Sequence, residues 1–193
     1  MSKRFALLSA AALGALALTA VVAAPVSAQD KMKSEMSGEK TVMVGGAAMF
    51  PSKNIIQNAV NSKDHTTLVA AVKAAGLVTT LEGKGPFTVF APTNAAFGKL
   101  PAGTVDTLVK PENKATLTKI LTYHVVPGKL EASDLTDGKV LKTAEGGELT
   151  VKRSGDQVMI VDAKGGSSTV TISNVNQSNG VIHVIDTVLM PAS

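Results

Sequence analysis

Three histidines are the side chains in this sequence best suited to acid–base chemistry or metal binding, because imidazole changes charge near neutral pH. Either role requires a partner group positioned within bonding distance. His124 lies on the apolar side of a helical repeat and His183 lies inside an apolar strand, so we expect both to pack in the core with a backbone hydrogen bond. His65 stands near a helix start, where we expect it to be exposed.

The nucleophile, phosphate and metal motifs of common enzymes are missing from the sequence. It contains no cysteine, no Gly-x-Ser-x-Gly elbow, no His-Glu-x-x-His pair and no Gly-Lys-Ser/Thr loop. The loop-like Gly83-Lys84-Gly85 is followed by Pro86, which lacks the N–H that a phosphate would need. Asp134-x-x-Asp137-Gly138 lacks the alternating oxygen ligands of a calcium loop. We therefore predict no catalytic residue, no metal site, no cofactor and no enzymatic activity.

Charge and aromatic content argue against nucleic acid as a partner. The net charge is +4 for the whole sequence. It is +2 without residues 1–28, which contain Lys3, Arg4 and no acidic residue. A nucleic-acid-binding domain needs a concentrated basic face. With five Phe, one Tyr and no Trp, the chain also has few aromatic rings on which bases could stack.

The N-terminal residues have the pattern of a secretory signal peptide. Lys3-Arg4 precede an apolar stretch from Phe5 to Ala24, and the small residues Val26-Ser27-Ala28 follow. We expect residues 1–28 to be removed by cleavage after Ala28, leaving a secreted, periplasmic or cell-surface protein without stable membrane insertion. Residues 29–41 are charged and nearly free of large aliphatic side chains, which is typical of a disordered linker.

The remaining chain changes from helical to strand-like periodicity, which favours an α+β fold. Helices are predicted over residues 54–60, over 65–75 with Asp64 or Thr66 as cap and Gly76 as stop, over 105–109, and from Pro111 to His124. Strands are predicted over residues 87–91, 149–151, 158–161, 170–172 and 181–189. The first and last of these strands are apolar on both faces, so we expect both to be central and to be neighbours.

Three segments carry more specific patterns than this periodicity. Residues 85–97 (GPFTVFAPTNAAF) contain the pattern of a strand, then a turn at Pro92, then the start of a helix that Thr93 can cap. Residues 123–128 (YHVVPG) follow the last helix, and residues 178–191 (SNGVIHVIDTVLMP) begin with the Asn-Gly pair of a hairpin turn. In this order and spacing the three segments resemble the fasciclin domain over roughly residues 54–191.

The resemblance implies a single fasciclin domain over residues 42–193. Its fold would be a β-sandwich-like wedge of about seven strands with several helices packed at one side. The motif residues, which the family uses chiefly for structure, are Thr88, Phe90, Pro92, Thr93, Asn94, Phe97, Asn179, Gly180, His183 and Asp186. Asn94 stands where Asp is frequent, and Asn174-Val175 stands where Asp-Ile is common, which weakens any proposal of a bound cation there.

Two functions remain open. The resemblance implies an adhesion or matrix-interaction module, whose partner would be an extracellular or cell-surface protein or a matrix component. Tyr123-His124 looks like the pair tied to integrin-dependent adhesion in animal members, although both residues can equally serve the core. The alternative is a carrier of an apolar small molecule, such as a carotenoid or a lipid. An exposed apolar groove would favour the carrier, and a closed core with a polar surface would favour adhesion.

Overall fold

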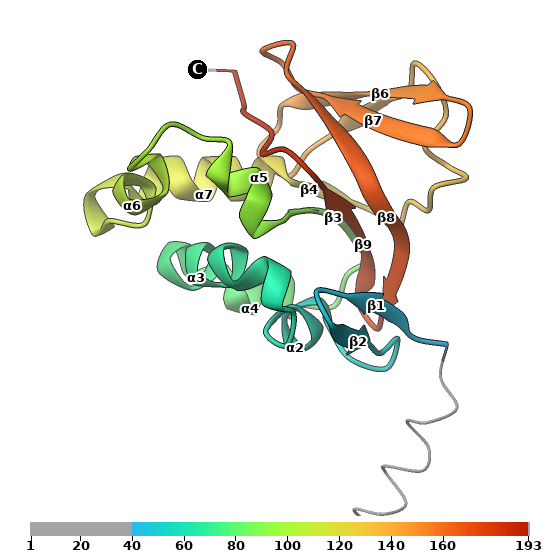
Figure 1. Cartoon of the computed structure of the whole chain (residues 1–193), viewed down its shortest axis with the longest axis horizontal. Coiled ribbons are helices and arrows are strands. Elements are labelled where there is room, and N and C mark those ends of the chain that lie inside the picture. The colour runs from blue at the N-terminus through green and yellow to red at the C-terminus, as the bar shows by residue number, and fades with distance from the viewer. Residues whose placement is uncertain (1–39, 193) are drawn as a thin grey trace, which may run out of the picture.

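The computed structural model describes residues 40–192, so the leader, its cleavage at Ala28 and most of the expected linker lie outside the described residues. Short helices gather on one side and a curved sheet forms the other (Figure 1). The helices are α2 (Ile55–Ala59), η1 (Lys63–His65), α3 (Thr66–Ala75), α4 (Val78–Leu81), α5 (Asn94–Gly98), α6 (Thr104–Leu108), η2 (Pro111–Asn113) and α7 (Lys114–Tyr123). The strands are β1 (Val42–Val44), β2 (Ala47–Met49), β3 (Phe87–Pro92), β4 (Val125–Pro127), β5 (Val140–Lys142), β6 (Glu148–Ser154), β7 (Gln157–Val161), β8 (Ser167–Gln177) and β9 (Gly180–Ile185).

The main sheet has seven strands in the order β4-β3-β9-β8-β7-β6-β5. Only β3 and β9 pair in parallel, from Phe87 opposite Gly180 to Pro92 opposite Ile185, which confirms the expectation that these two strands are neighbours. The edge strands also meet, because the Ala144 N–H after β5 donates to the Val125 carbonyl in β4 at 2.7 Å. The sheet therefore curls almost into a closed barrel, and the mixed α+β fold class is confirmed.

Strand β8 connects the two halves of the sheet. Its first three residues pair with β7, and residues 170–177 pair with β9. Two register shifts interrupt the second pairing, and Asn174 adopts a left-handed φ of 56° within the second of them. Such irregularities bend a strand, which lets β8 leave one part of the curled sheet and enter the other.

Apolar side chains form two cores, one on each face of β3 and β9. Val89 and Ile182 face the core beneath the helices, whereas Phe90 and Ile185 face the core inside the curled sheet. Alternating side chains of a strand point to opposite faces, so a strand that is covered on both faces has a continuous run of apolar residues in its sequence. This explains why the sequences of β3 and β9 lack a polar face.

The helices follow their sequence signals with local exceptions. Asn54 and Gln57 form a capping box at α2, and Gly76 ends α3 at a left-handed φ of 75°. The expected cap of α3 at Asp64 or Thr66 was wrong, because His65 occupies the cap position and makes no side-chain cap bond. The one-turn helix α4 was not predicted, since four residues are too few to show a periodicity.

The strands also depart from expectation at three places. The residues before α2, for which the sequence predicted no strand, form the hairpin β1–β2, which turns at Gly45-Gly46 with positive φ at both glycines. Strands β4 and β5 have three residues each and went unpredicted. The last strand ends at Ile185 rather than Leu189, because side chains replace backbone carbonyls as acceptors beyond it: the Thr169 N–H donates to the Asp186 carboxylate, and the Thr187 N–H donates to the Ser168 hydroxyl.

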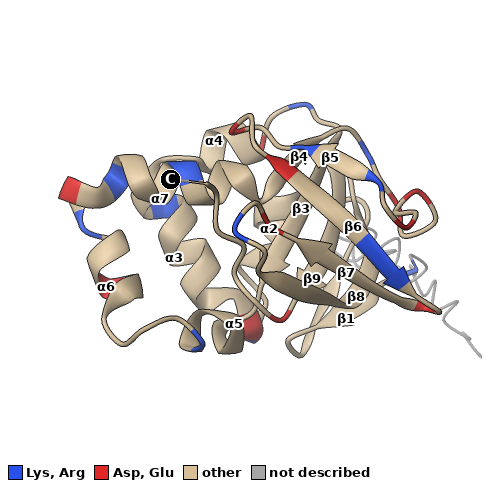
Figure 2. Cartoon of the chain, turned by 90° about the horizontal axis from the view of Figure 1, so that it is seen from above, with Lys and Arg blue, Asp and Glu red and all other residues tan. Residues whose placement is uncertain are grey.

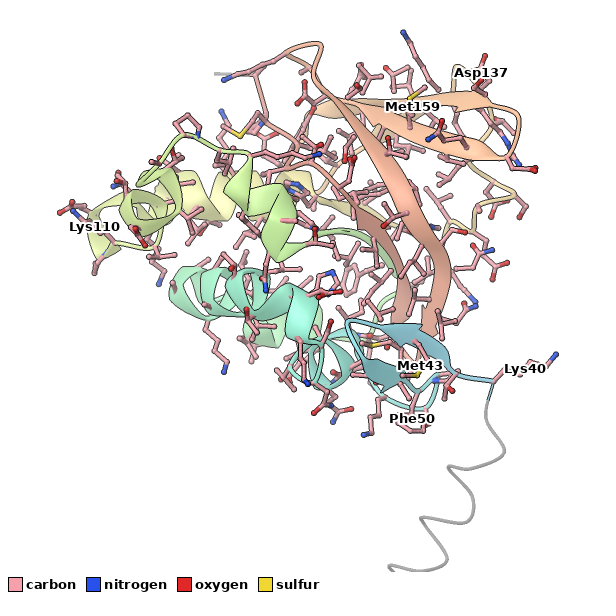
Figure 3. The ribbon with its side chains drawn as sticks, in the orientation of Figure 1. Lys40, Met43, Phe50, Lys110, Asp137 and Met159 are labelled. Carbon is pink, nitrogen blue, oxygen red and sulfur yellow. The ribbon has the colours of Figure 1, made fainter. Side chains whose placement is uncertain are left out.

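Positions of basic and of acidic residues both occur along the ribbon of the helical part and of the sheet (Figure 2). The hairpin end of the molecule carries Met43 and Phe50, and Lys110 lies at the opposite, helical end (Figure 3). None of the helices between residues 40 and 192 is long and apolar enough to cross a membrane.

Candidate functional site where the motif segments converge

Asn179 ties three elements together at the turn between β8 and β9. Its side-chain oxygen accepts the Ile55 N–H at the start of α2 at 3.1 Å. Its side-chain nitrogen donates to the carbonyls of Leu81 at 2.7 Å and Gly83 at 3.0 Å, at the end of α4. A side-chain amide can donate and accept at once, so asparagine suits this position and aspartate does not.

The same turn lies against the start of β3. The Phe87 N–H donates to the Asn179 carbonyl at 3.1 Å. A Cβ atom added to Gly180 would overlap the Phe87 carbonyl, and one added to Gly85 would overlap the Asn179 carbonyl. Only glycine permits this approach of two backbones, which accounts for the glycines at both positions.

Thr88 and His183 fasten the loop after β4 to the paired strands β3 and β9. The Thr88 hydroxyl donates to the Gly128 carbonyl at 2.6 Å and accepts the Leu130 N–H at 2.9 Å. His183 donates through Nε2 to the Leu130 carbonyl at 2.8 Å, and its ring stacks on Phe90 with centroids 5.7 Å apart. Burial lowers the pKa of His183 against the opposing effects of that carbonyl and of Glu131. The expectation that His183 packs with one backbone bond is confirmed.

Tyr123 is fully buried in the core inside the curled sheet. Its hydroxyl donates to the Glu148 carbonyl at 2.7 Å and accepts the Ala163 N–H at 2.9 Å, so it links α7 to β6 and to the loop after β7. Burial raises the pKa of the phenol. The side chain offers no surface to a partner in the folded domain.

His124 is buried as expected, with 2% of its surface exposed. Its Nδ1–H donates to the Ile120 carbonyl at 2.8 Å, and its Nε2 accepts the Leu189 N–H at 3.0 Å. These two bonds require the neutral ring, because a charged imidazole has no acceptor nitrogen. Burial lowers the pKa of His124 to about 4, although the Ile120 carbonyl and Asp162 act in the opposite direction.

Two neighbouring motif residues cap different helices. Thr93 accepts the Ala96 N–H at 3.2 Å and caps α5, as the sequence predicted. The Asn94 side-chain oxygen accepts the Thr67 N–H at 3.0 Å, and its nitrogen donates to the Lys63 carbonyl at 2.8 Å. Asn94 therefore caps α3 from another part of the chain, a role that no local pattern could reveal.

Asp186 organises the end of β9. Its Oδ1 accepts the Thr169 N–H at 2.9 Å and the Thr187 hydroxyl at 3.0 Å, and its Oδ2 lies 3.3 Å from the Lys99 ammonium. Partial burial alone would raise the pKa of this carboxyl, but the bonds from Thr169, Thr187 and Lys99 outweigh it and hold the pKa below the ordinary value. The remaining motif residues, Pro92 and Phe97, end β3 and fill the core beneath the helices.

The expected exposure of His65 was wrong. The side chain is 3% exposed, and its Nδ1 lies 2.9 Å from the Ser62 hydroxyl. The 3₁₀ turn η1 directs the ring inward immediately before α3 begins. Burial lowers its pKa, opposed by the Ala91 backbone and by Asp64.

Two hollows differ sharply in chemistry. An apolar cavity of about 40 Å³ lies within the core beneath the helices, between residues such as Leu68, Val72 and Ile182. A polar groove of about 600 Å³ opens where the motif segments reach the surface. We call it the motif groove; its polar side chains include Asn54, Gln57, Glu82, Lys84, Lys129 and Ser178. The sequence reasoning missed this groove, because its lining residues come from separate parts of the sequence.

No group of three or more His, Asp or Glu side chains converges for a metal ion within residues 40–192. Asn174 stands at the position where the resemblance implies that Asp is common. Its side-chain oxygen accepts the Ala132 N–H at 2.7 Å. That bond gives the asparagine a structural use at the irregular part of β8.

Comparisons with known proteins match this fold and these motifs. The model of the family described as Fasciclin domain matches residues 63–191. Protein sll1483 of Synechocystis sp. is 51% identical over 79% of this chain and 82% of its own length. Immunogenic protein MPB70 of Mycobacterium bovis is 35% identical over 95% of this chain and 94% of its own, and Cell surface glycolipoprotein MPB83 of the same species is 40% identical over 77% and 64%.

A solved structure agrees at the level of the fold. The FAS1 domain pair of the insect cell adhesion molecule Fasciclin I superposes with a TM-score of 0.65 at 19% identity. The match covers 73% of this chain and 52% of that one, so the chain spans about half of the solved pair.

Proposed function

The chain belongs to the fasciclin family, and from this premise we propose that its mature form is a non-enzymatic interaction module of the cell surface or the extracellular space. In this role it binds a surface protein or matrix component through its own exterior. One of the relatives is named a cell surface glycolipoprotein, which supports the location.

The observation that carries the proposal is the use of the motif side chains. Thr88, Tyr123, His124, Asn179 and Asp186 each direct their polar atoms to partners within the domain. Side chains engaged in this way hold a rigid scaffold and have no free group for a substrate. Function then falls to the exposed surface that the scaffold supports.

The motif groove is the part of that surface that we propose as the contact region. It is open, polar and framed by the turn at Asn179 and by the start of β3, both of which are held rigidly by the bonds described above. Rigid, pre-organised surfaces lose little entropy on binding. Lys84 and Lys129 are exposed at its rim, although Lys129 also lies 3.3 Å from Glu131.

Attachment of the purified mature protein to cells and to extracellular matrix tests the proposal. Lys84→Glu should weaken attachment without changing the melting temperature, because the side chain is exposed. Lys110→Glu, an identical charge change at the opposite helical end, is the matched control and should attach normally. Equal attachment of both variants and the original protein would refute the groove as contact region.

The Tyr123-His124 pair needs a separate test, because both side chains are buried in the folded domain. Tyr123→Phe removes the hydroxyl that bonds to Glu148 and Ala163, so the variant should melt earlier and lose attachment only in proportion to the unfolded fraction. Abolished attachment with an unchanged melting temperature would mean that the pair contacts the partner directly.

The carrier hypothesis finds less support. Pockets for drug-sized ligands have volumes of roughly 300–1,000 Å³, whereas the apolar cavity holds about 40 Å³. An absorption spectrum and mass spectrometry of an organic extract, both on protein from its native source, test this alternative. A stoichiometric apolar molecule would favour the carrier over the adhesion module.

A further inference from the structure

The pair Asn179-Gly180 has a chemical property that its structural role does not use. In an Asn-Gly sequence the glycine nitrogen can attack the side-chain carbonyl carbon of the asparagine. The new C–N bond closes a five-membered succinimide, the nitrogen loses its proton, and the side-chain nitrogen leaves as ammonia. Water then opens the ring to aspartate or isoaspartate. Glycine gives the attacking nitrogen the least steric hindrance, and this is the only Asn-Gly pair in the sequence.

The folded structure holds both reacting groups away from this path. The side-chain amide of Asn179 is fixed by Ile55, Leu81 and Gly83, at 3.1, 2.7 and 3.0 Å. The backbone is fixed as well, because the Asn179 carbonyl accepts the Phe87 N–H and Gly180 pairs with Phe87 in the parallel ladder. Ring closure requires the side chain to rotate toward the next backbone nitrogen, which breaks these bonds.

We propose that Asn179-Gly180 is a deamidation site that the native fold protects from reaction. Once the pair has reacted in an unfolded molecule, the chain can no longer regain its fold. A carboxylate at position 179 cannot donate to the carbonyls of Leu81 and Gly83, so three oxygen atoms face one another without a proton. Isoaspartate also inserts one more main-chain atom at the turn. The backbone contact between Gly180 and Phe87 has no space for such a change.

The chain contains its own reference site. Asn61-Ser62 also carries a small residue after asparagine, and Asn61 is exposed with one side-chain bond, to the Gln57 carbonyl. In the unfolded chain Asn179 should react faster than Asn61, because glycine hinders attack less than serine. In the native protein the order should reverse, because Asn179 can react only in the small fraction of molecules that are unfolded. If that opening is global, deamidation at Asn179 becomes about a thousandfold slower or more.

The first experiment incubates the full mature chain at mildly alkaline pH, native or in urea, and measures deamidation at both positions by peptide mass spectrometry. Reversal of the order between the two conditions is the expected result. Equal or faster reaction at Asn179 in the native protein would overturn the proposal.

The second experiment refolds the chains aged in urea and separates folded from unfolded molecules. Chains modified at position 179 should collect in the unfolded fraction, and chains modified only at position 61 should refold like unmodified ones. An equal share of modified position 179 in both fractions would refute the block on refolding. Asn179→Asp, made directly, separates the effect of the carboxylate from that of the isoaspartyl linkage, and we expect it to melt earlier than the original protein.

Discussion

His124 should make the stability of this domain depend on pH in a window where few other groups titrate. The ring is neutral in both states above pH 6.5. Below pH 6.5 the ring becomes protonated in the unfolded chain, whereas in the folded protein it stays neutral until the pH approaches its lowered pKa of about 4. Stability is therefore complete above about pH 6.5 and falls as the pH drops toward 4. With these two pKa values, the free energy of unfolding falls by about 2–3 kcal/mol between pH 7.5 and 4.5.

Urea titrations at half-unit steps across this range measure the effect. His65 and His183, whose pKa values are also lowered by burial, add losses of the same sign. Asp186 acts in a separate window, because its lowered pKa places its loss of stability below the ordinary carboxyl pKa.

The variant His124→Gln isolates the contribution of this ring. At pH 7.5 it should be less stable by about 1–3 kcal/mol, because the Ile120 carbonyl or the Leu189 N–H loses its partner. Its stability should then fall less steeply on acidification than that of the original protein, by about one bound proton. An equal slope in the two proteins would refute the assignment of the pH dependence to His124.

Three further substitutions test other parts of the structure by urea or thermal unfolding. Phe90→Ala should cost about 3–5 kcal/mol, because the ring is fully buried; a loss below about 1 kcal/mol would contradict its place in the core. Asn94→Ala should cost about 1 kcal/mol by removing the cap of α3, and an unchanged stability would show that the cap is dispensable. Gly180→Ala should destabilise the domain strongly through its overlap with the Phe87 carbonyl, whereas Gly98→Ala, with open space around it, should not; similar effects of the two would refute the close backbone approach.

Much of the fold follows from patterns within single elements. The apolar runs of β3 and β9 predicted two central neighbouring strands, and the structure confirms their pairing. Thr93 and Gly76 predicted a helix start and a helix end correctly, because both signals act within a few residues of the backbone they satisfy. The family resemblance rested on the same segments, which is why it was specific.

What the sequence did not reveal depends on contacts between distant residues. Asn94 caps a helix that begins 28 positions earlier in the chain, and Asn179 bonds to residues about a hundred positions away. His65 is buried because a 3₁₀ turn redirects it, and no periodicity covers three residues. The motif groove arises only when four separate segments meet, so its residues share no local pattern.

The unequal attachment of the two ends of the described chain has a mechanical consequence. Strand β9, which leads to residue 192, is bonded along its length to β3 on one side and β8 on the other, so tension on that end loads many bonds in parallel. Within residues 40–192, β1 and β2 pair only with each other, and the Lys63 N–H is bonded to their turn at the Gly45 carbonyl. Tension at residue 40 would therefore first load this hairpin, which is held to the body by that bond and by the buried side chains of Val44 and Met49, and only then the main sheet. Release of the hairpin would lengthen the pulled segment and relieve the load while the motif-bearing body stays folded.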